Sequence, residues 1–255
     1  MKFIINADDF GISHNVNMAI VECFEKGYIT NTTIMTNMPA FDEAVQLAHE
    51  HGFADKVGLH LNFVEGRPLS EAMKGDKYFC PDGQMISPMK SRKGIIYKFF
   101  LPRSTGAALE EETRAQIGKY LDAGFTQMHI DSHQHLHTLS SVWGYVGKTI
   151  KQSGFLTIRK TRNLFLKKLS APVAFYKDIF NRVVGRDYIT TEYFTSAHEY
   201  AQIADTGFES KANCEIMVHP KFQDGKLINI GSMDFEDLMQ YLEDEEKISY
   251  SQLKG

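Results

Sequence analysis

The chain has 255 residues, of which 43% are hydrophobic and 24% are charged, and its formal net charge is -4. This length and composition suit one large α/β domain or two small ones with a sizeable core. The negative charge argues against a general nucleic-acid binder, which would usually be basic. No apolar run approaches the ~18–20 residues of a membrane span, so no membrane partner is expected.

Two further features indicate the compartment. The N-terminal residues Met1–Asn6 turn polar too soon for a secretory signal peptide. The cysteines Cys23, Cys80 and Cys214 are odd in number and lack the spacing of a metal site, which is typical of reduced thiols. The sequence therefore predicts a cytoplasmic protein.

Short β-like runs alternate along the chain with longer helical patterns. The expected strands are Phe3–Ala7, Thr32–Met38, Val57–Phe63, the histidine-rich run that starts at His129, Phe155–Arg159 and Cys214–Val218. The expected helices are Ser13–Glu25, capped by Ser13 with Gly27 just beyond it, and Pro39–Ala48, Glu110–Ala123, Val142–Gln152 and Asp234–Asp244. Repeated β–α units predict a parallel sheet, either open or closed into a barrel.

The segment 64–106 is long and rich in glycine, proline and basic residues. A connection of this length within a compact domain is usually functional or partly disordered. We therefore expect a single domain over residues 1–255, with 64–106 as an insertion over the site. The segment carries the aromatic residues Tyr78, Phe79, Tyr97, Phe99 and Phe100. They could stack on a ligand, but we expect at least half of them to pack onto the domain. Residues Asn163–Thr195 form a second expected excursion.

Unusual polar residues stand at the ends of the first and third expected strands. Asp8 and Asp9 are adjacent carboxylates, which repel each other unless a cation or a proton neutralises one. Alternation on the third strand places His60 and Asn62 on the face opposite the leucines. A lone histidine in an apolar strand is about as often a core residue as a ligand.

The run from His129 to His137 contains four histidines. On a strand, alternation would send His129, Asp131 and His133 to one face, about 6–7 Å apart, so that only one or two histidines can reach a given metal ion. His219 stands at the end of the last apolar strand, where Pro220 ends the pairing.

The carboxyl ends of parallel strands converge on one crevice, so these residues are expected to lie together. An Asp/His/His set with open positions suits a divalent metal ion that activates water. The other aspartate is then free to act as a general base, and a separate histidine can protonate a leaving group.

These motifs resemble those of the YdjC-like carbohydrate deacetylases, the family that includes chitooligosaccharide deacetylases. The matching motifs occur in family order and span nearly the whole chain: Asn6–Gly11, Gly58–His60, His129–His137 and Val218–Pro220. The resemblance implies an α/β fold of the (β/α) barrel-like kind, related to the polysaccharide deacetylases and with room for fewer than eight strands, such as an irregular seven-stranded barrel. Gln134 departs from the family pattern, since many members have a histidine there.

The resemblance also implies roles for individual residues. It implies metal ligation by Asp9, His60 and His133, with Mg²⁺ as the usual ion and Zn²⁺ as a credible substitute. By analogy with the wider group, Asp8 is the general base and His219 the general acid.

Five further residues are expected to support the ligands or to touch the substrate: Asp131, His129, His135, Asn62 and Arg159. Arg159 ends a strand-like run and is expected to point into the crevice. The basic residues that follow it, up to Lys168, are interpreted as a solvated surface, with recognition of a phosphorylated sugar as the alternative.

The resulting hypothesis is hydrolysis of the N-acetyl group of an amino sugar in a short acetylated oligosaccharide. The family resemblance and the general frequency of dimers also predict a homodimer. Three alternatives remain at this stage: a phosphoesterase, which would often assemble two metal ions, an iron-dependent oxygenase, and a non-catalytic sugar-binding protein with a structural metal.

Overall fold

The computed structural model describes residues 1–87, 99–231 and 233–254. Its centre is a parallel sheet with strand order β5-β4-β3-β2-β1-β7-β6, to which β11 adds a short pairing with β1. These strands are β1 (Lys2–Phe10), β2 (Asn31–Ile34), β3 (Val57–Leu61), β4 (His129–Ser132), β5 (Thr157–Ile158), β6 (Tyr193–Ser196), β7 (Asn213–Val218) and β11 (Glu246–Lys247). A small antiparallel sheet contains β8 (Pro220–Gln223), β9 (Lys226–Asn229) and β10 (Met233–Asp234).

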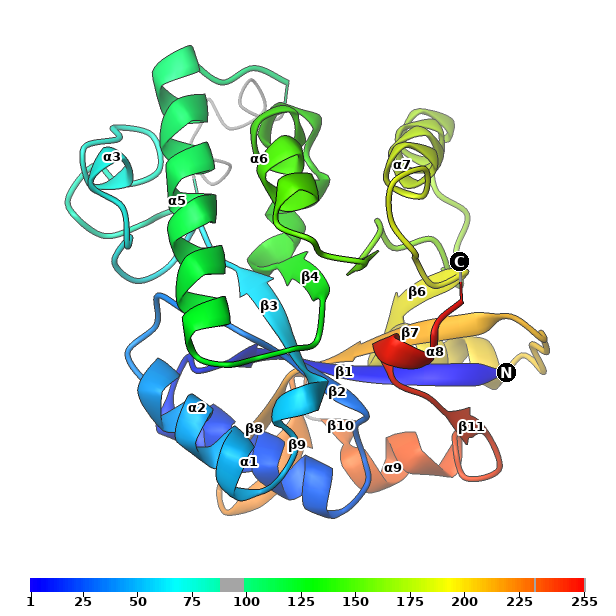
Figure 1. Cartoon of the computed structure of the whole chain (residues 1–255). Helices are drawn as coiled ribbons and strands as arrows, with labels where there is room; N and C mark the ends of the chain where they lie inside the picture. The colour runs from blue at the N-terminus through cyan, green and yellow to red at the C-terminus, as the bar shows by residue number, and fades with distance from the viewer. Residues whose placement is uncertain (88–98, 232, 255) are drawn as a thin grey trace.

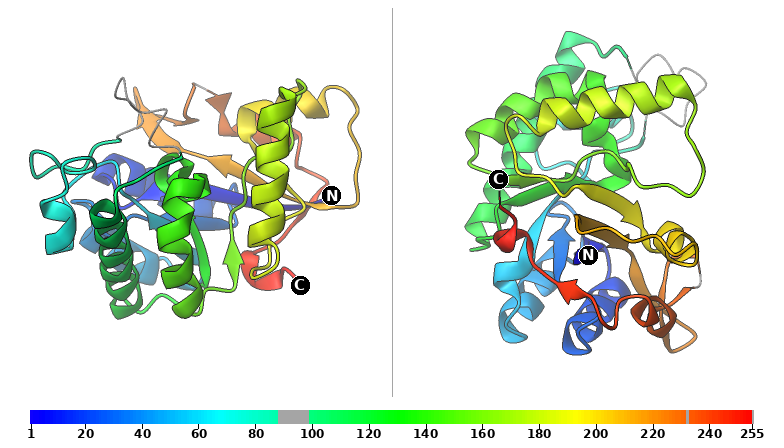
Figure 2. Two further views of the ribbon diagram at one scale, coloured as in Figure 1. Left: turned by 90° about the horizontal axis from the view of Figure 1, so that it is seen from above. Right: turned by 90° about the vertical axis from the view of Figure 1, so that its right-hand side faces the viewer.

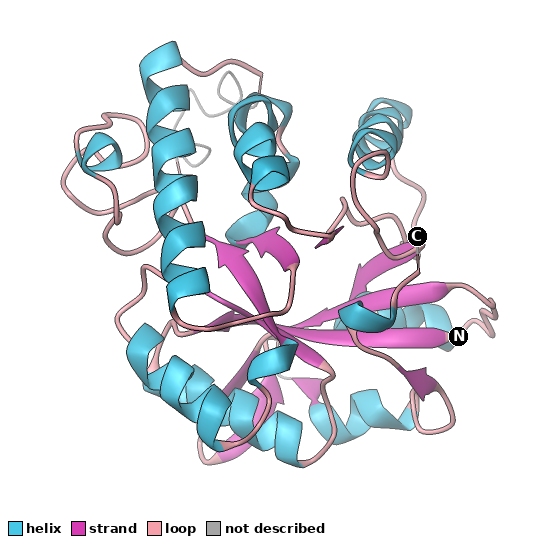
Figure 3. Cartoon of the chain, in the orientation of Figure 1, coloured by secondary structure: helices cyan, strands magenta, loops and turns pink. Residues whose placement is uncertain are grey.

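Helices surround the curled sheet, as Figures 1 and 3 show. In the view of Figure 1, α5, α6 and α7 lie above the sheet, and α1, α2 and α9 lie below it. The helices are α1 (His14–Glu25), α2 (Phe41–Glu50), α3 (Glu71–Lys74), α5 (Arg103–Asp122), α6 (Ser140–Gln152), α7 (Ala171–Val184), α8 (Ala197–Ala204) and α9 (Phe235–Gln240), with short 3-10 turns at Ala54–Lys56, His133–Thr138 and Tyr250–Gln252. No helix in the described ranges is long and apolar enough to cross a membrane.

The sheet forms an incomplete barrel, which confirms the expected (β/α) barrel-like fold. Every residue of β2, β3 and β4 is buried, because helices cover the outer face and other strands close over the inner one. The ends of the strand order, β5 and β6, are linked by the segment after β5, where the backbone amides of Asn163 and Leu164 donate to the carbonyl of Phe194.

The signals that predicted α1 act as expected. The hydroxyl of Ser13 accepts a hydrogen bond from the backbone amide of Val16, which satisfies one of the free donors of the first turn. Gly27, just beyond the helix, has a φ of 68°, a left-handed conformation that glycine adopts without strain.

Several expected boundaries differ from the structure. The expectation that a strand carries the alternation as far as His133 is wrong, because β4 ends at Ser132 and a 3-10 turn begins there. Within that turn Gln134 and His135 have φ values of 53° and 54°, and two successive left-handed residues end the extended conformation of β4. Because α5 begins at Arg103, the last residues of the expected insertion are helical. The excursion 163–195 contains α7 and most of β6.

The aromatic residues of the expected insertion have different environments. Phe79 is fully buried, in agreement with packing, whereas Phe99 and Phe100 are 68% and 78% exposed. Tyr97, together with the rest of residues 88–98, lies outside the described residues.

Replacement of Gly58 by alanine should destabilise the fold. An added Cβ would lie 2.9 Å from the carbonyl oxygen of His129 and 3.1 Å from Cγ2 of Thr33, so neighbouring strands would have to move apart. We expect a loss of about 1–3 kcal/mol in the free energy of unfolding, measured by urea titration. The control is Gly118→Ala in α5, where a Cβ meets nothing within 4 Å and should not destabilise. Equal stability of the two variants would contradict the prediction.

Candidate metal and catalytic centre

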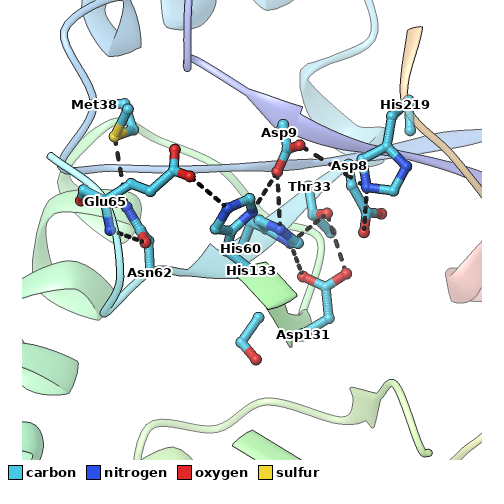
Figure 4. Close-up of polar contacts among 12 residues, drawn as sticks. Asp8, Asp9, Thr33, Met38, His60, Asn62, Glu65, Asp131, His133 and His219 are labelled. Carbon is cyan, nitrogen blue, oxygen red and sulfur yellow. Dashed lines mark hydrogen bonds and ion pairs between the residues drawn. The ribbon is translucent and has the colours of Figure 1, made fainter. Parts of the chain in front are cut away.

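Three potential ligands meet at the carboxyl end of the barrel (Figure 4). Asp9 lies on β1, His60 on β3 and His133 in the turn after β4. Asp9 Oδ1 is 2.8 Å from Nδ1 of His133 and 3.3 Å from Nε2 of His60. One donor atom from each residue lies within 4.8 Å of the others, so the group could hold one metal ion.

Irregular backbone places two of these side chains. Asp9 has a φ of 70°, a left-handed conformation that costs a non-glycine residue of order 1 kcal/mol or more. The pairing of β1 with β2 changes register between Ala7 and Phe10, at the same point. The chain after His133 is also left-handed, at Gln134 and His135. The strands thus bring the ligands near one another, and local turns aim them.

Asp131 fixes the orientation of His60. Its Oδ1 lies 2.6 Å from Nδ1 of His60, and the hydroxyl of Thr33 contacts both side chains at 3.2 Å. With Nδ1 engaged, Nε2 of His60 is left to face Asp9. Burial disfavours a charge on this imidazole. Asp131 and Asp9 outweigh burial and raise the pKa of His60 to about 10 when no metal ion is bound.

Glu65 occupies the corresponding position beside His133. Nε2 of His133 makes no hydrogen bond among the described residues and lies 3.5 Å from Oε1 of Glu65. Asn62 holds the turn that carries Glu65: its Oδ1 accepts from the Val64 and Glu65 amides, and its Nδ2 donates to the Glu65 carbonyl. Asn62 therefore fixes the backbone that positions Glu65 beside His133.

Asp8 points to the inside of the barrel and is bound by Arg159. The guanidinium donates from Nη1 to Asp8 Oδ2 at 2.6 Å and from Nη2 to Asp8 Oδ1 at 2.7 Å. Its Nη1 also forms an ion pair with Asp131 Oδ2 at 2.7 Å, and its Nε donates to Glu215 Oε1 at 2.5 Å. All four side chains are buried.

The charges in this cluster are interdependent. Burial is the largest single effect on Asp8 and Asp131 and opposes their ionisation, but Arg159 and His60 together outweigh it and lower the pKa of both carboxyls. Burial raises the pKa of Glu215, against the pull of Arg159. The carboxylates in turn raise the pKa of Arg159, so its charge is permanent.

His219 directly follows β7 and lies near both Asp8 and Asp9. Its Nε2 is 3.9 Å from Asp8 Oδ2 and 3.9 Å from Asp9 Oδ2, and its backbone amide donates to Asn229 Oδ1. Its side chain is 24% exposed, so a ligand above the aspartates can reach it.

Two histidines of the run have contacts elsewhere. His129 stacks on Tyr250 with ring centroids 3.5 Å apart, and its Nδ1 is 3.0 Å from the Thr157 hydroxyl. His135 packs edge-on against Phe194. Burial lowers the pKa of each of these histidines to about 3, so both are neutral at physiological pH.

Among the expected site residues, the structure brings together Asp8, Asp9, His60, Asp131, His133, Arg159 and His219. Three further residues lie in the same cluster and were not among the expected ones. Glu215 had a visible signal, a lone charged residue in an apolar strand. Thr33 and Glu65 had none, because a threonine suits any strand and Glu65 lies past a strand end.

Comparison with known proteins gives a consistent family. The profile of the YdjC-like proteins matches residues 2–250. A carbohydrate deacetylase of Halalkalibacterium halodurans is 31% identical over 88% of this chain and 86% of its own length. One from Thermoanaerobacter pseudethanolicus is 29% identical over the full length of both chains. A crystal structure from Enterococcus faecalis V583, provisionally described as a cellobiose-phosphate cleavage protein, has the same fold, with a TM-score of 0.65, 22% identity and coverage of 98% and 97% of the two chains.

Replacement of Asp131 by asparagine should lower the pKa of His60, because it removes the negative charge that offsets burial of the imidazolium. In EDTA-treated wild type, His60 should keep its second proton up to about pH 10. In Asp131→Asn it should lose that proton about one pH unit lower or more. The measurement is a histidine ¹⁵N NMR titration.

The same proton contributes stability fully below the ordinary histidine pKa of 6.5, and this contribution fades as the pH rises through about 10. His51, which follows the last turn of α2 and does not contact the cluster, is the control resonance. Identical His60 titrations in the two proteins would show that Asp131 does not set its charge.

Proposed function

The chain belongs to the YdjC-like protein family, and from this membership and the geometry of the centre we propose that it is a carbohydrate deacetylase. The proposed reaction is hydrolysis of the N-acetyl group of an amino sugar in a short oligosaccharide, such as a chitooligosaccharide. The observation that carries the proposal is the second carboxylate, Asp8, beside a group of three ligands that does not need it.

The three residues fit a divalent ion. Asp9, His60 and His133 offer one carboxylate oxygen and two imidazole nitrogens, and Asp131 already fixes the His60 tautomer. Two nitrogen donors suit Zn²⁺, whereas Mg²⁺, the ion expected from the resemblance, prefers oxygen. An ion bound there would polarise the acetyl carbonyl and lower the pKa of a bound water molecule to about 7.

Asp8 is proposed to accept the proton of the attacking water. An ionised carboxylate has about four acceptor positions. On Asp8, Oδ1 accepts from Asn6 at 2.8 Å and from Arg159 at 2.7 Å, and Oδ2 accepts from Arg159 at 2.6 Å. The remaining position is on Oδ2, the oxygen nearest to His219. Arg159 thus keeps the base ionised and fixed while one acceptor position stays free.

His219 is proposed to donate a proton to the departing amine nitrogen. Its Nε2 faces the same space as Asp8 Oδ2 and Asp9 Oδ2. Proton acceptor and proton donor therefore flank one volume, as cleavage of an amide by water requires. The C–N bond breaks as the nitrogen takes the proton, and acetate and a free amino sugar are released.

A two-metal phosphoesterase is less consistent with this arrangement. A second group of ligand atoms exists at Asp8, His60 and Asp131. Arg159 Nη1 already lies 2.6 Å from Asp8 Oδ2 and 2.7 Å from Asp131 Oδ2, so a permanent cation occupies the position of a second ion. A closed structural metal site is disfavoured because Glu65, beside His133, is 41% exposed.

Each proposed proton transfer can be removed by one substitution. Asp8→Asn and His219→Gln should each lower kcat for acetate release from N-acetylated chitobiose by about 10²–10⁴-fold, since each removes one proton transfer. The assay is run with Mg²⁺ and with Zn²⁺, and with p-nitrophenyl phosphate as the phosphoesterase substrate. His51→Gln, at the other end of the barrel, should retain wild-type activity. Full activity of Asp8→Asn would exclude Asp8 as the base.

The proposed ligand set also predicts how many metal ions the protein binds. Calorimetric titration of EDTA-treated protein should give about one Zn²⁺ or Mg²⁺ per chain, and His133→Ala should abolish binding because it removes one of three ligands. Glu65→Gln should weaken binding by about tenfold, because it removes the negative charge beside His133 Nε2. A stoichiometry of two, or unchanged affinity in His133→Ala, would contradict the assigned ligand set.

A further inference from the structure

A cavity of about 860 Å³ lies between α7 and the segment that leads into it from β5 (α7 is seen in Figure 2). None of the residues that line it belongs to the metal and catalytic centre. Six basic side chains line this cavity, which we call the α7 cavity: Lys160, Arg162, Lys167, Lys168, Lys177 and Arg182.

The α7 cavity has a strong excess of positive charge. Against the six basic residues its wall holds one carboxylate, Asp178, which pairs with Arg182 at 2.9 Å. The whole chain has a net charge of -4, so this concentration of cations is not a reflection of overall composition. A small anion is the ligand that such a wall would attract.

Three of the cations are partly or fully buried and donate their hydrogen bonds to neutral oxygens. Lys160, 8% exposed, donates to the carbonyl of Glu192 at 2.6 Å. Lys177 donates to the carbonyl of Arg162 at 3.0 Å, and Arg162 donates to the hydroxyl of Ser196. None of these three forms an ion pair with a carboxylate within the described ranges.

The positive charges are also crowded around one aromatic ring. The Arg162 guanidinium carbon and Lys177 Nζ lie 5.0 Å and 5.1 Å from the ring centroid of Phe165. Burial lowers the pKa of Lys160 to about 8, and burial together with Arg162 lowers that of Lys177 to about 8. A bound anion would relieve this repulsion and restore full charge to both lysines.

We propose that the α7 cavity binds a small molecule through a phosphate group. A phosphate offers several charged acceptor oxygens to guanidinium and ammonium donors, which makes such hydrogen bonds shorter and stronger than neutral ones. The volume exceeds that of the phosphate alone and leaves room for a sugar-sized remainder. An extended polyanion such as nucleic acid is disfavoured by the negative net charge. This site is separate from the metal centre and does not depend on the proposed deacetylase activity.

The test is calorimetric titration of the full chain with inorganic phosphate and, separately, with glucose 6-phosphate. Lys177→Gln and the exposed Lys168→Gln should each weaken binding by about tenfold, the loss expected for one charged hydrogen bond. Lys148→Gln on α6 is the matched control and should bind as the wild type does. Thermal melting without ligand identifies any variant that is merely unfolded, and Lys168→Gln keeps the test valid if Lys177→Gln is unstable.

The variant His133→Ala separates the two sites. Unchanged phosphate affinity in His133→Ala, with weaker affinity in the two lysine variants, supports the proposal. Tighter binding of glucose 6-phosphate than of phosphate would support contacts beyond the phosphate group, and equal binding would support recognition of phosphate alone. Loss of binding in His133→Ala with full binding in the lysine variants would place the anion on the metal centre and overturn the proposal. So would the absence of binding by either probe at millimolar concentration.

Discussion

The buried Arg159 guanidinium is the interaction on which the rest of this structure depends. It follows β5 and binds carboxylates from β1, β4 and β7, so one side chain connects opposite parts of an incomplete barrel. Removal of one partner from a buried ion pair typically costs about 3–5 kcal/mol, because the other charge is left uncompensated. Here one arginine compensates three acidic groups. Its loss would leave Asp8 and Glu215 buried without their cation and would leave Asp131 paired with His60 alone.

The same cation couples the ligands to the catalytic groups. It lowers the pKa of Asp131, and ionised Asp131 holds the His60 tautomer that directs Nε2 to Asp9. It lowers the pKa of Asp8 as well, and together with Asn6 it takes up three of the acceptor positions of that carboxylate. The proposed metal ligation and the proposed proton transfer are thus not independent: a change at Arg159 would alter both through charge and position, without touching a proposed ligand.

The sequence could predict the strand-end residues because parallel strands place their carboxyl ends together whatever the outer helices do. Asp9, His60 and His219 follow from that rule and from alternation. His133 does lie beside Asp9, but it is placed there by a turn and not by β4, as the alternation had suggested. The environment of His129 could not be predicted, because its stacking partner is Tyr250, which is 121 residues away near the C-terminus. Glu65 was missed since its placement depends on the Asn62 turn.

The histidine-rich run makes sense once its residues are assigned to separate tasks. His133 faces Asp9, and His129 packs in the core. His137 supports Arg159: its Nε2 is 2.8 Å from the Arg159 carbonyl, which can only accept, so Nε2 carries the proton and Nδ1 accepts from the Ser132 hydroxyl at 2.6 Å. Burial lowers the pKa of His137 to about 4, which keeps the ring in this neutral form. A run that resembles one cluster of ligands therefore supplies one proposed ligand, His133, at its middle and anchors Arg159 at its end.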